Sequence, residues 1–125
     1  MSVKTKKYYY LILFWALAFL YNISVGQPQH IKFKHLTSDH GLSQNWIRCI
    51  IQDSDGFMWF GTGGNGLNKY DGYEFKIYKN KAGDNNSLTS NWINCMYVDK
   101  KKRLWIGTQH GLNLYDKEKD NFIRF

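Results

Sequence analysis

Residues 53–71 read D-S-D-G-F-M-W-F-G-T-G-G-N-G-L-N-K-Y-D, and residues 99–116 repeat the pattern as D-K-K-K-R-L-W-I-G-T-Q-H-G-L-N-L-Y-D. The shared positions are Asp53 and Asp99, Trp59 and Trp105, Gly61 and Gly107, Thr62 and Thr108, and Gly66 and Gly111. Two copies of one pattern within 125 residues indicate a repeat protein, so the repeat decides the fold.

Each copy lies within a longer unit that holds four strand-sized runs. The runs are 46–52, 57–62, 66–70 and 74–78 in the first unit, and 92–98, 104–108, 111–115 and 121–125 in the second. Tight turn signals separate the runs, among them Asp71-Gly72, a strong hairpin signal. Units of about 40–45 residues with four strands each are typical of β-propeller blades.

The segment before the first unit adds one more expected strand. Residues 31–36 alternate apolar and polar side chains, and residues 33–36 resemble the last run of each unit. We therefore predict an all-β fold of antiparallel four-stranded β-propeller blades: an incomplete propeller of two blades plus one orphan strand, after an N-terminal signal helix. Since known propellers use about four to eight blades, the expected partners are the remaining blades of a longer chain or other copies.

The first 26 residues have the pattern of a secretory signal peptide. Their only charges are three lysines within residues 1–7, and an uncharged, largely apolar run follows at residues 8–20. Ser24 and Gly26 then supply small residues before a cut at Gln27. An uncleaved membrane anchor is the alternative, although the apolar run is shorter than the ~20 residues that span a bilayer. We expect a periplasmic or secreted protein.

These patterns divide the chain into four parts. The expected boundaries are 1–26 for the signal peptide, 27–45 for a linker with the orphan outer strand, 46–87 for blade 1 and 88–125 for blade 2.

Charge and composition argue against a nucleic-acid partner. The net charge is +7, but without the leader 14 basic and 10 acidic residues remain. The one basic run, residues 100–103, falls where the repeat requires a tight turn, whereas a phosphate-binding patch spreads over a face. Aromatic residues make up 18% of the chain, which suits a β-rich fold and a carbohydrate binder.

The two cysteines occupy equivalent positions of the two units. Cys49 and Cys95 are expected to point the same way rather than toward each other, which disfavours a disulfide. We predict free, buried thiols. No CxxC or Cys/His spacing indicates a metal site, and no metal or cofactor is expected.

Two pairs of tryptophans have different expected roles. Trp59 and Trp105 precede glycines in mid-strand and are predicted to fill the core between blades. Asn45 and Trp46, with Asn91 and Trp92, open the first strand of each blade, where inner strands ring the channel of a propeller. These four residues are the candidate ligand site, in which an indole stacks on a sugar and an amide binds its hydroxyls. Packing beneath the loop is the alternative.

No catalytic constellation is present in the sequence. There is no Ser/His/Asp arrangement, paired-carboxylate site or nucleotide fingerprint, and the glycine-rich residues 61–66 join two strands rather than opening a helix. We therefore expect this chain not to be an enzyme.

The pattern D-x-x-G-x-x-W-x-G-T-x-x-G-L-x-x-Y-D resembles the two-component regulator propeller repeat. The second copy departs from it at Arg103, which replaces the turn glycine, and the first copy carries one extra residue before Gly66. The resemblance implies the N-terminal periplasmic part of a hybrid sensor histidine kinase that often detects glycan breakdown products, so an oligosaccharide is the implied ligand. A stand-alone, lectin-like secreted module that oligomerises is one alternative, and the truncated start of a propeller enzyme is another.

Overall fold

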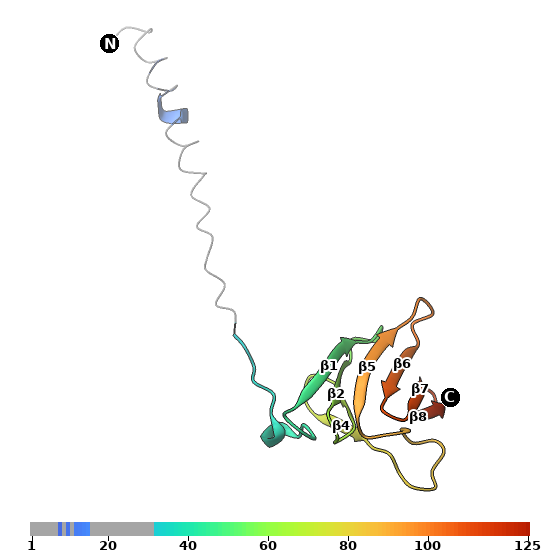
Figure 1. Ribbon diagram of the computed structural model, residues 1–125. Helices are drawn as coiled ribbons and strands as arrows, with labels where there is room; N and C mark the ends of the chain where they lie inside the picture. The colour runs from blue at the N-terminus through green and yellow to red at the C-terminus, as the bar shows by residue number, and fades with distance from the viewer. Residues whose placement is uncertain (1–7, 9, 11, 16–31) are drawn as a thin grey trace. The chain divides into compact units, whose positions relative to one another are not determined.

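The computed structural model describes residues 8, 10, 12–15 and 32–125, and the chain divides into two compact units, Met1–Phe33 and Lys34–Phe125 (Figure 1). In the first unit the described residues 8, 10 and 12–15 are helical and exposed. Among the described residues, no helix is long and apolar enough to cross a membrane. Most of the predicted signal peptide, with its cleavage site, lies outside the described residues and stays a prediction.

The second unit consists of two antiparallel four-stranded sheets, each built from consecutive strands. The strands are β1 (Ile47–Gln52), β2 (Met58–Thr62), β3 (Leu67–Tyr70) and β4 (Phe75–Tyr78) in blade 1, and β5 (Ile93–Val98), β6 (Leu104–Thr108), β7 (Gly111–Asp116) and β8 (Asn121–Arg124) in blade 2. The sheet orders are β1-β2-β3-β4 and β5-β6-β7-β8, and the innermost strands β1 and β5 lie beside each other (Figure 1). The predicted all-β architecture of four-stranded blades is confirmed.

An aspartate organises the first turn of each blade in the same way. Asp53 Oδ1 accepts backbone N–H bonds from Asp55 and Phe57, and its Oδ2 accepts the indole N–H of Trp59 at 2.7 Å. Asp99 repeats all three bonds in blade 2, with 3.0 Å from Trp105 Nε1. In each blade one carboxylate thus closes the turn and orients the tryptophan of the next strand.

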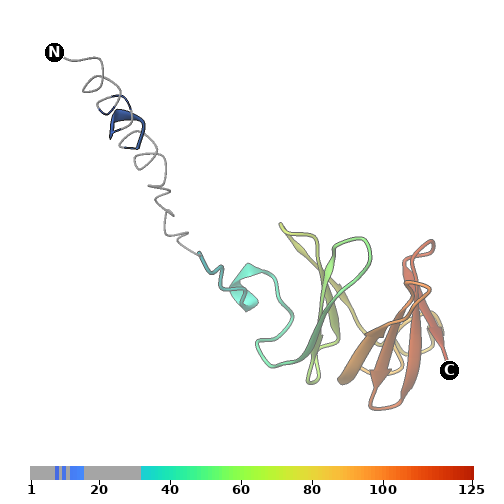
Figure 2. The same cartoon turned by 90° about the horizontal axis from the view of Figure 1, so that it is seen from above.

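The two sheets pack against each other (Figure 2). Buried apolar side chains fill the seam between them. Trp59 and Leu67 of blade 1 and Ile93 and Ile106 of blade 2 are all 0% exposed. A Cβ at Gly61 would lie 2.6 Å from Ile93 Cγ2, so glycine is what permits this approach. The prediction that Trp59 belongs to an inter-blade core is confirmed.

A buried asparagine in the third strand of each blade holds the segment that enters that blade. Asn68 Oδ1 accepts the Ser43 N–H at 2.8 Å, and its Nδ2 donates to Ser43 Oγ and to the Phe60 carbonyl. In blade 2, Asn113 makes the same three bonds to Thr89 and Ile106. Each blade therefore carries its own polar clip, whose asparagine is fully buried and hydrogen-bonded through both its oxygen and its nitrogen.

The predicted orphan strand is not a strand in the structure. Residues 32–37 belong to no helix or strand, while Ile31 lies outside the described residues. Leu36 and Leu42 instead pack on the outer face of blade 1 against Phe60 and Tyr70. The expected half-buried alternation is also absent, since Phe33 is 85% exposed and of residues 32–36 only Leu36 is partly buried. A strand needs a neighbouring strand to pair with, and none of the described residues provides one.

Blade 2 has an uncovered apolar face. It is the face equivalent, in the repeat, to the face of blade 1 that forms the seam. Tyr97, Leu112, Ile123 and Phe125 on this face are 61%, 41%, 46% and 66% exposed. The sequence placed Trp105 and Cys95 in a core, but Trp105 is only partly buried and Cys95 is exposed. No described residue covers this side of the second sheet, so the prediction of a buried Cys95 is wrong and that of a core Trp105 holds only in part. Both cysteines are free, as predicted.

Candidate functional site

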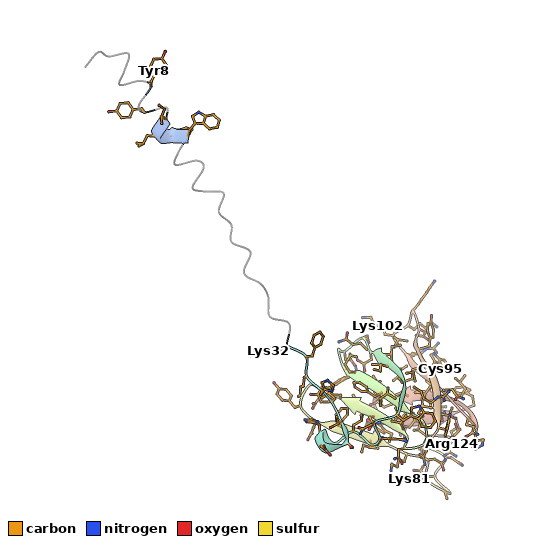
Figure 3. All side chains as sticks on the ribbon, turned by 60° about the vertical axis from the view of Figure 1, so that its left-hand side comes forward. Tyr8, Lys32, Lys81, Cys95, Lys102 and Arg124 are labelled. Atoms are coloured by element: carbon orange, nitrogen blue, oxygen red, sulfur yellow. The ribbon has the colours of Figure 1, made fainter. Side chains whose placement is uncertain are left out.

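The strand order gives the two sheets chemically different ends. The "tryptophan end" comprises the segments that lead into β1 and β5 (43–46 and 88–92) and the β2–β3 and β6–β7 turns (63–66 and 109–110). The "acidic end" comprises the turns 53–57, 71–74, 99–103 and 117–120. Lys81, next to the tryptophan end, and Lys102, in the acidic end, are labelled on opposite sides of the sheets in Figure 3.

Trp46 and Trp92 meet at the tryptophan end although they come from different blades. Their ring centroids lie 5.2 Å apart with the planes at 84°, an edge-to-face contact. Gly63 lies against the Trp46 ring, donates its N–H to the Trp46 carbonyl at 3.2 Å and forms a bridge to Trp92. The structure thus brings together the two tryptophans that the sequence singled out. Trp46 remains 52% exposed, so part of its ring is free to contact a ligand.

The two asparagines beside these tryptophans hold the local backbone. Asn45 Oδ1 accepts the N–H of Ser38 at 2.8 Å, and Asn91 Oδ1 accepts the N–H of Asn80 at 2.7 Å. Their carbonyl oxygens are therefore already used. The amide group of Asn91 keeps its Nδ2 without a hydrogen-bond partner among the described residues, so Asn91 retains a free donor.

An open cavity adjoins Trp92. It has a volume of about 340 Å³ and is lined by Gly64, Asn80, Thr89, Ser90, Asn91, Trp92, Gln109 and His110. Of this lining, only Asn91 and Trp92 were predicted from the sequence. The available signal for the others was positional, because Gly64, Gln109 and His110 occupy the turns that the repeat places at the same end.

Arg48 extends the site along β1. Its guanidinium lies 5.4 Å from the centroid of the Trp92 ring, a cation–π contact between the two blades. Arg48 is exposed and forms no ion pair within the part of the chain that the structure describes. The repeat does not single out Arg48, since Asn94 stands at the matching position of blade 2.

The acidic end carries a hydrogen-bonded cluster across the seam. Asp120 Oδ1 accepts the hydroxyls of Tyr78 of blade 1 and Tyr115 of blade 2, each at 2.6 Å, and its Oδ2 pairs with Lys76. Burial opposes the charge on Asp120, but the bonds from Lys76, Tyr115 and Tyr78 outweigh it and lower the pKa to about 2. Burial, and then the bond to Asp120, raises the pKa of Tyr115 to about 12 and that of Tyr78 further still. This cluster ties the blades together.

Lys69 reinforces the seam from blade 1. Its Nζ lies 3.9 Å from the Phe57 ring centroid, 5.3 Å from that of Trp59 and 5.5 Å from that of Tyr115. The matching residue of blade 2 is Leu114, on the uncovered face. The cation therefore occupies an aromatic cage that exists only where two blades meet.

No group of three or more His, Cys, Asp or Glu side chains in residues 8, 10, 12–15 and 32–125 could hold a metal ion. At the tryptophan end the described residues offer aromatic surface, amide and indole donors, and the Arg48 guanidinium, which forms no ion pair there.

Comparisons with known proteins identify the repeat. Residues 41–64 and 87–110 match the family model of the two component regulator propeller. Over 62 residues, half of this chain, the sequence is 45% identical to histidine kinase P4 of Formosa agariphila.

Solved structures with the same arrangement are extracellular domains. The extracellular domain of BT3049 from B. thetaiotaomicron, described as a hybrid two component system, matches 74% of this chain with a TM-score of 0.65 and 38% identity. That of BT4673 from the same organism matches 65% with a TM-score of 0.54 and 34% identity. This chain spans 4% of the length of the curated relative and 13% and 11% of the two solved chains.

Proposed function

We propose that this chain, which carries two two-component regulator propeller repeats, is part of the extracellular sensor region of a hybrid two-component system and contributes to a glycan-binding surface. The observation that carries the proposal is the match of both blades, in sequence and in structure, to extracellular domains of such systems. In this proposal the chain reaches the periplasm through its leader and performs no catalysis, and the kinase activity belongs to the longer protein.

The tryptophan end supplies the proposed binding surface. Trp46 and Trp92 provide an aromatic corner, and Asn91 provides a donor beside an open cavity. Exposed indoles next to amide donors suit sugars, whose rings have apolar faces and polar edges. Asn45 supports this surface by holding the preceding loop rather than by binding the ligand itself.

Saccharide titration with fluorescence detection tests this function. The chain is titrated with a panel of neutral and acidic oligosaccharides, and binding is expected to change the emission of Trp46 and Trp92. Trp46→Ala should abolish the response, whereas Tyr97→Ala, which removes an exposed aromatic on another face, should preserve it. A panel without a binder, or a binder indifferent to Trp46→Ala, would reject the proposal.

We further propose that the uncovered face of blade 2 receives another blade. This proposal is supported by the contact between the two blades, because blade 2 covers the equivalent face of blade 1. The partner is either a later blade of a longer chain or blade 1 of a second copy, as in a self-assembling lectin. Light scattering distinguishes them: a defined oligomer of several subunits favours the stand-alone module, and a monomer or an aggregating species favours a longer parent.

A further inference from the structure

We infer that the tryptophan end takes an anionic saccharide, one that bears a carboxylate or a sulfate group, and that Arg48 binds the anion. The inference rests on the proposed function and narrows its ligand to a chemical class.

Arg48 has a charge that nothing in the described part of the chain neutralises. A second arginine provides the contrast: Arg103 lies 5.2 Å from the Trp105 ring centroid, much as Arg48 lies over Trp92, but it also pairs with Asp99 at 2.7 Å. When the flat face of a guanidinium stacks on an indole, the ring holds the group in place. The N–H groups point outward from the guanidinium edge and stay free to donate hydrogen bonds. Such a fork matches the oxygens of a carboxylate or sulfate.

Carboxylates are concentrated at the far end of the sheets. Eight of the ten acidic residues lie at the acidic end or at the strand end that enters it: Asp53, Asp55, Asp71, Glu74, Asp99, Asp116, Glu118 and Asp120. None of the residues that line the cavity beside Trp92 is acidic. An anion at the tryptophan end therefore meets a cation and no nearby repulsion from the cavity wall.

Free hydrogen-bond donors lie at this end, beside one buried acceptor, Gln44 Oε1, that also has no partner among the described residues. The indole N–H groups of Trp46 and Trp92 and the Asn91 Nδ2 have no partner among the described residues, while the Asn91 and Asn45 carbonyl oxygens are occupied. A neutral sugar presents hydroxyls that need acceptors as well as donors. Carboxylate and sulfate oxygens only accept. The free indole and amide N–H groups can therefore donate to such oxygens, next to the Arg48 guanidinium.

The aromatic corner accounts for the saccharide part of the ligand. The half-exposed Trp46 ring meets the Trp92 ring at 84°, so a ligand ring on one indole lies next to the edge of the other. The adjoining cavity of about 340 Å³ is at the lower end of the range for small-molecule sites, which suits one or two sugar units.

Calorimetric titration of the chain with matched saccharides tests the inference. The probes are cellobiouronic acid with cellobiose, which differ in one carboxylate, and lactose 6′-sulfate with lactose, which differ in one sulfate. We expect an acidic probe to bind at least about tenfold more tightly than its neutral partner, the effect of one charge-assisted hydrogen bond. The pair that shows this difference identifies which anion is recognised.

Arg48→Gln should abolish the preference for the acidic probe over its neutral partner. Arg103→Gln, the matched substitution at the acidic end, should leave that preference unchanged. Both arginines are exposed, and circular dichroism checks that the variants stay folded. Raising the salt concentration should weaken the binding of the acidic probe but not that of its neutral partner. Equal binding of acidic and neutral probes, or a preference that survives Arg48→Gln, overturns the inference while the saccharide function stands. Absence of binding by all four probes and by the oligosaccharide panel rejects both.

Discussion

Blade 1 and blade 2 have nearly the same internal structure but very different surfaces. Leu67 of blade 1 is 0% exposed, whereas Leu112 at the same position of blade 2 is 41% exposed. Tyr78 is 8% exposed and its counterpart Phe125 is 66% exposed. Turn aspartates, asparagine clips and strand pairing are alike in both blades. The repeat therefore determines the fold of each blade, and the presence of a neighbour determines which face becomes core.

The largest expected difference between the blades concerns their tryptophans. Trp59→Ala removes a fully buried ring at the seam and should lower the free energy of unfolding by about 3–5 kcal/mol. Trp105→Ala removes a partly buried ring on the uncovered face and should cost roughly half of that or less. Urea denaturation of the two variants measures both losses. Equal losses would mean that the two faces are equally covered in solution.

The asparagine clips should, in contrast, be equivalent. Asn68→Ala and Asn113→Ala each remove three hydrogen bonds, one of them buried and two partly buried, so each should lower stability by about 2–3 kcal/mol. Asn94→Ala is the control, since Asn94 is exposed and should change stability by less than about 0.5 kcal/mol. A clear inequality between the two clips in denaturation experiments would show that blade 2 is not independently formed.

The strand glycines give a smaller test of the same contrast. A Cβ at Gly61 would lie 2.6 Å from both Cys49 Sγ and Ile93 Cγ2, so Gly61→Ala should force the blades apart at a cost of about 1–3 kcal/mol. A Cβ at Gly107 would meet mainly the sulfur of Cys95, which is exposed and has room to rotate. Gly107→Ala should therefore cost less than Gly61→Ala. The midpoint of thermal unfolding ranks the two variants, and the reverse order would contradict the seam.

The smallest expected effect is the pH dependence of the seam. The pKa of Asp120 is about 2 in the folded chain and near 3.9 when unfolded, so its contribution is fully present above pH ~4. That contribution is lost as the pH falls from about 4 to 2, because the unfolded state binds the proton first. Asp120→Asn should flatten the stability curve in this window. Glu118→Gln, at an exposed neighbouring position, should leave the curve unchanged, and a matching change there would disprove the assignment to Asp120.

The strands were predictable because the repeat supplies each pattern twice. All eight predicted runs agree with the observed strands to within one residue at each end. Trp59, Gly61 and Asp53 stood out because they recur with fixed spacing. The shared Asn68 and Asn113 were visible in the same alignment, and a polar residue repeated in mid-strand was the available signal for the clips.

The remaining features depend on contacts that the repeat does not encode. Asp120, Lys69 and Arg48 act between blades, and each has a different residue at the matching position of the other unit. The prediction of an orphan strand was wrong for the same reason, since an alternating pattern does not show whether a neighbouring strand is present to pair with it. For the candidate site, the sequence identified Trp46 and Trp92, but only the fold brings them together and adds the free cation.

The asparagine clips also bear on how the chain reaches its folded state. Each clip joins residues only 24 or 25 positions apart, and each sheet pairs only consecutive strands. Short sequence separations reduce the loop-closure entropy and speed folding. Blade 1 has all of its internal contacts once Tyr78 has emerged from the ribosome or the translocon. We therefore expect blade 1 to become ordered first and blade 2 to fold onto it.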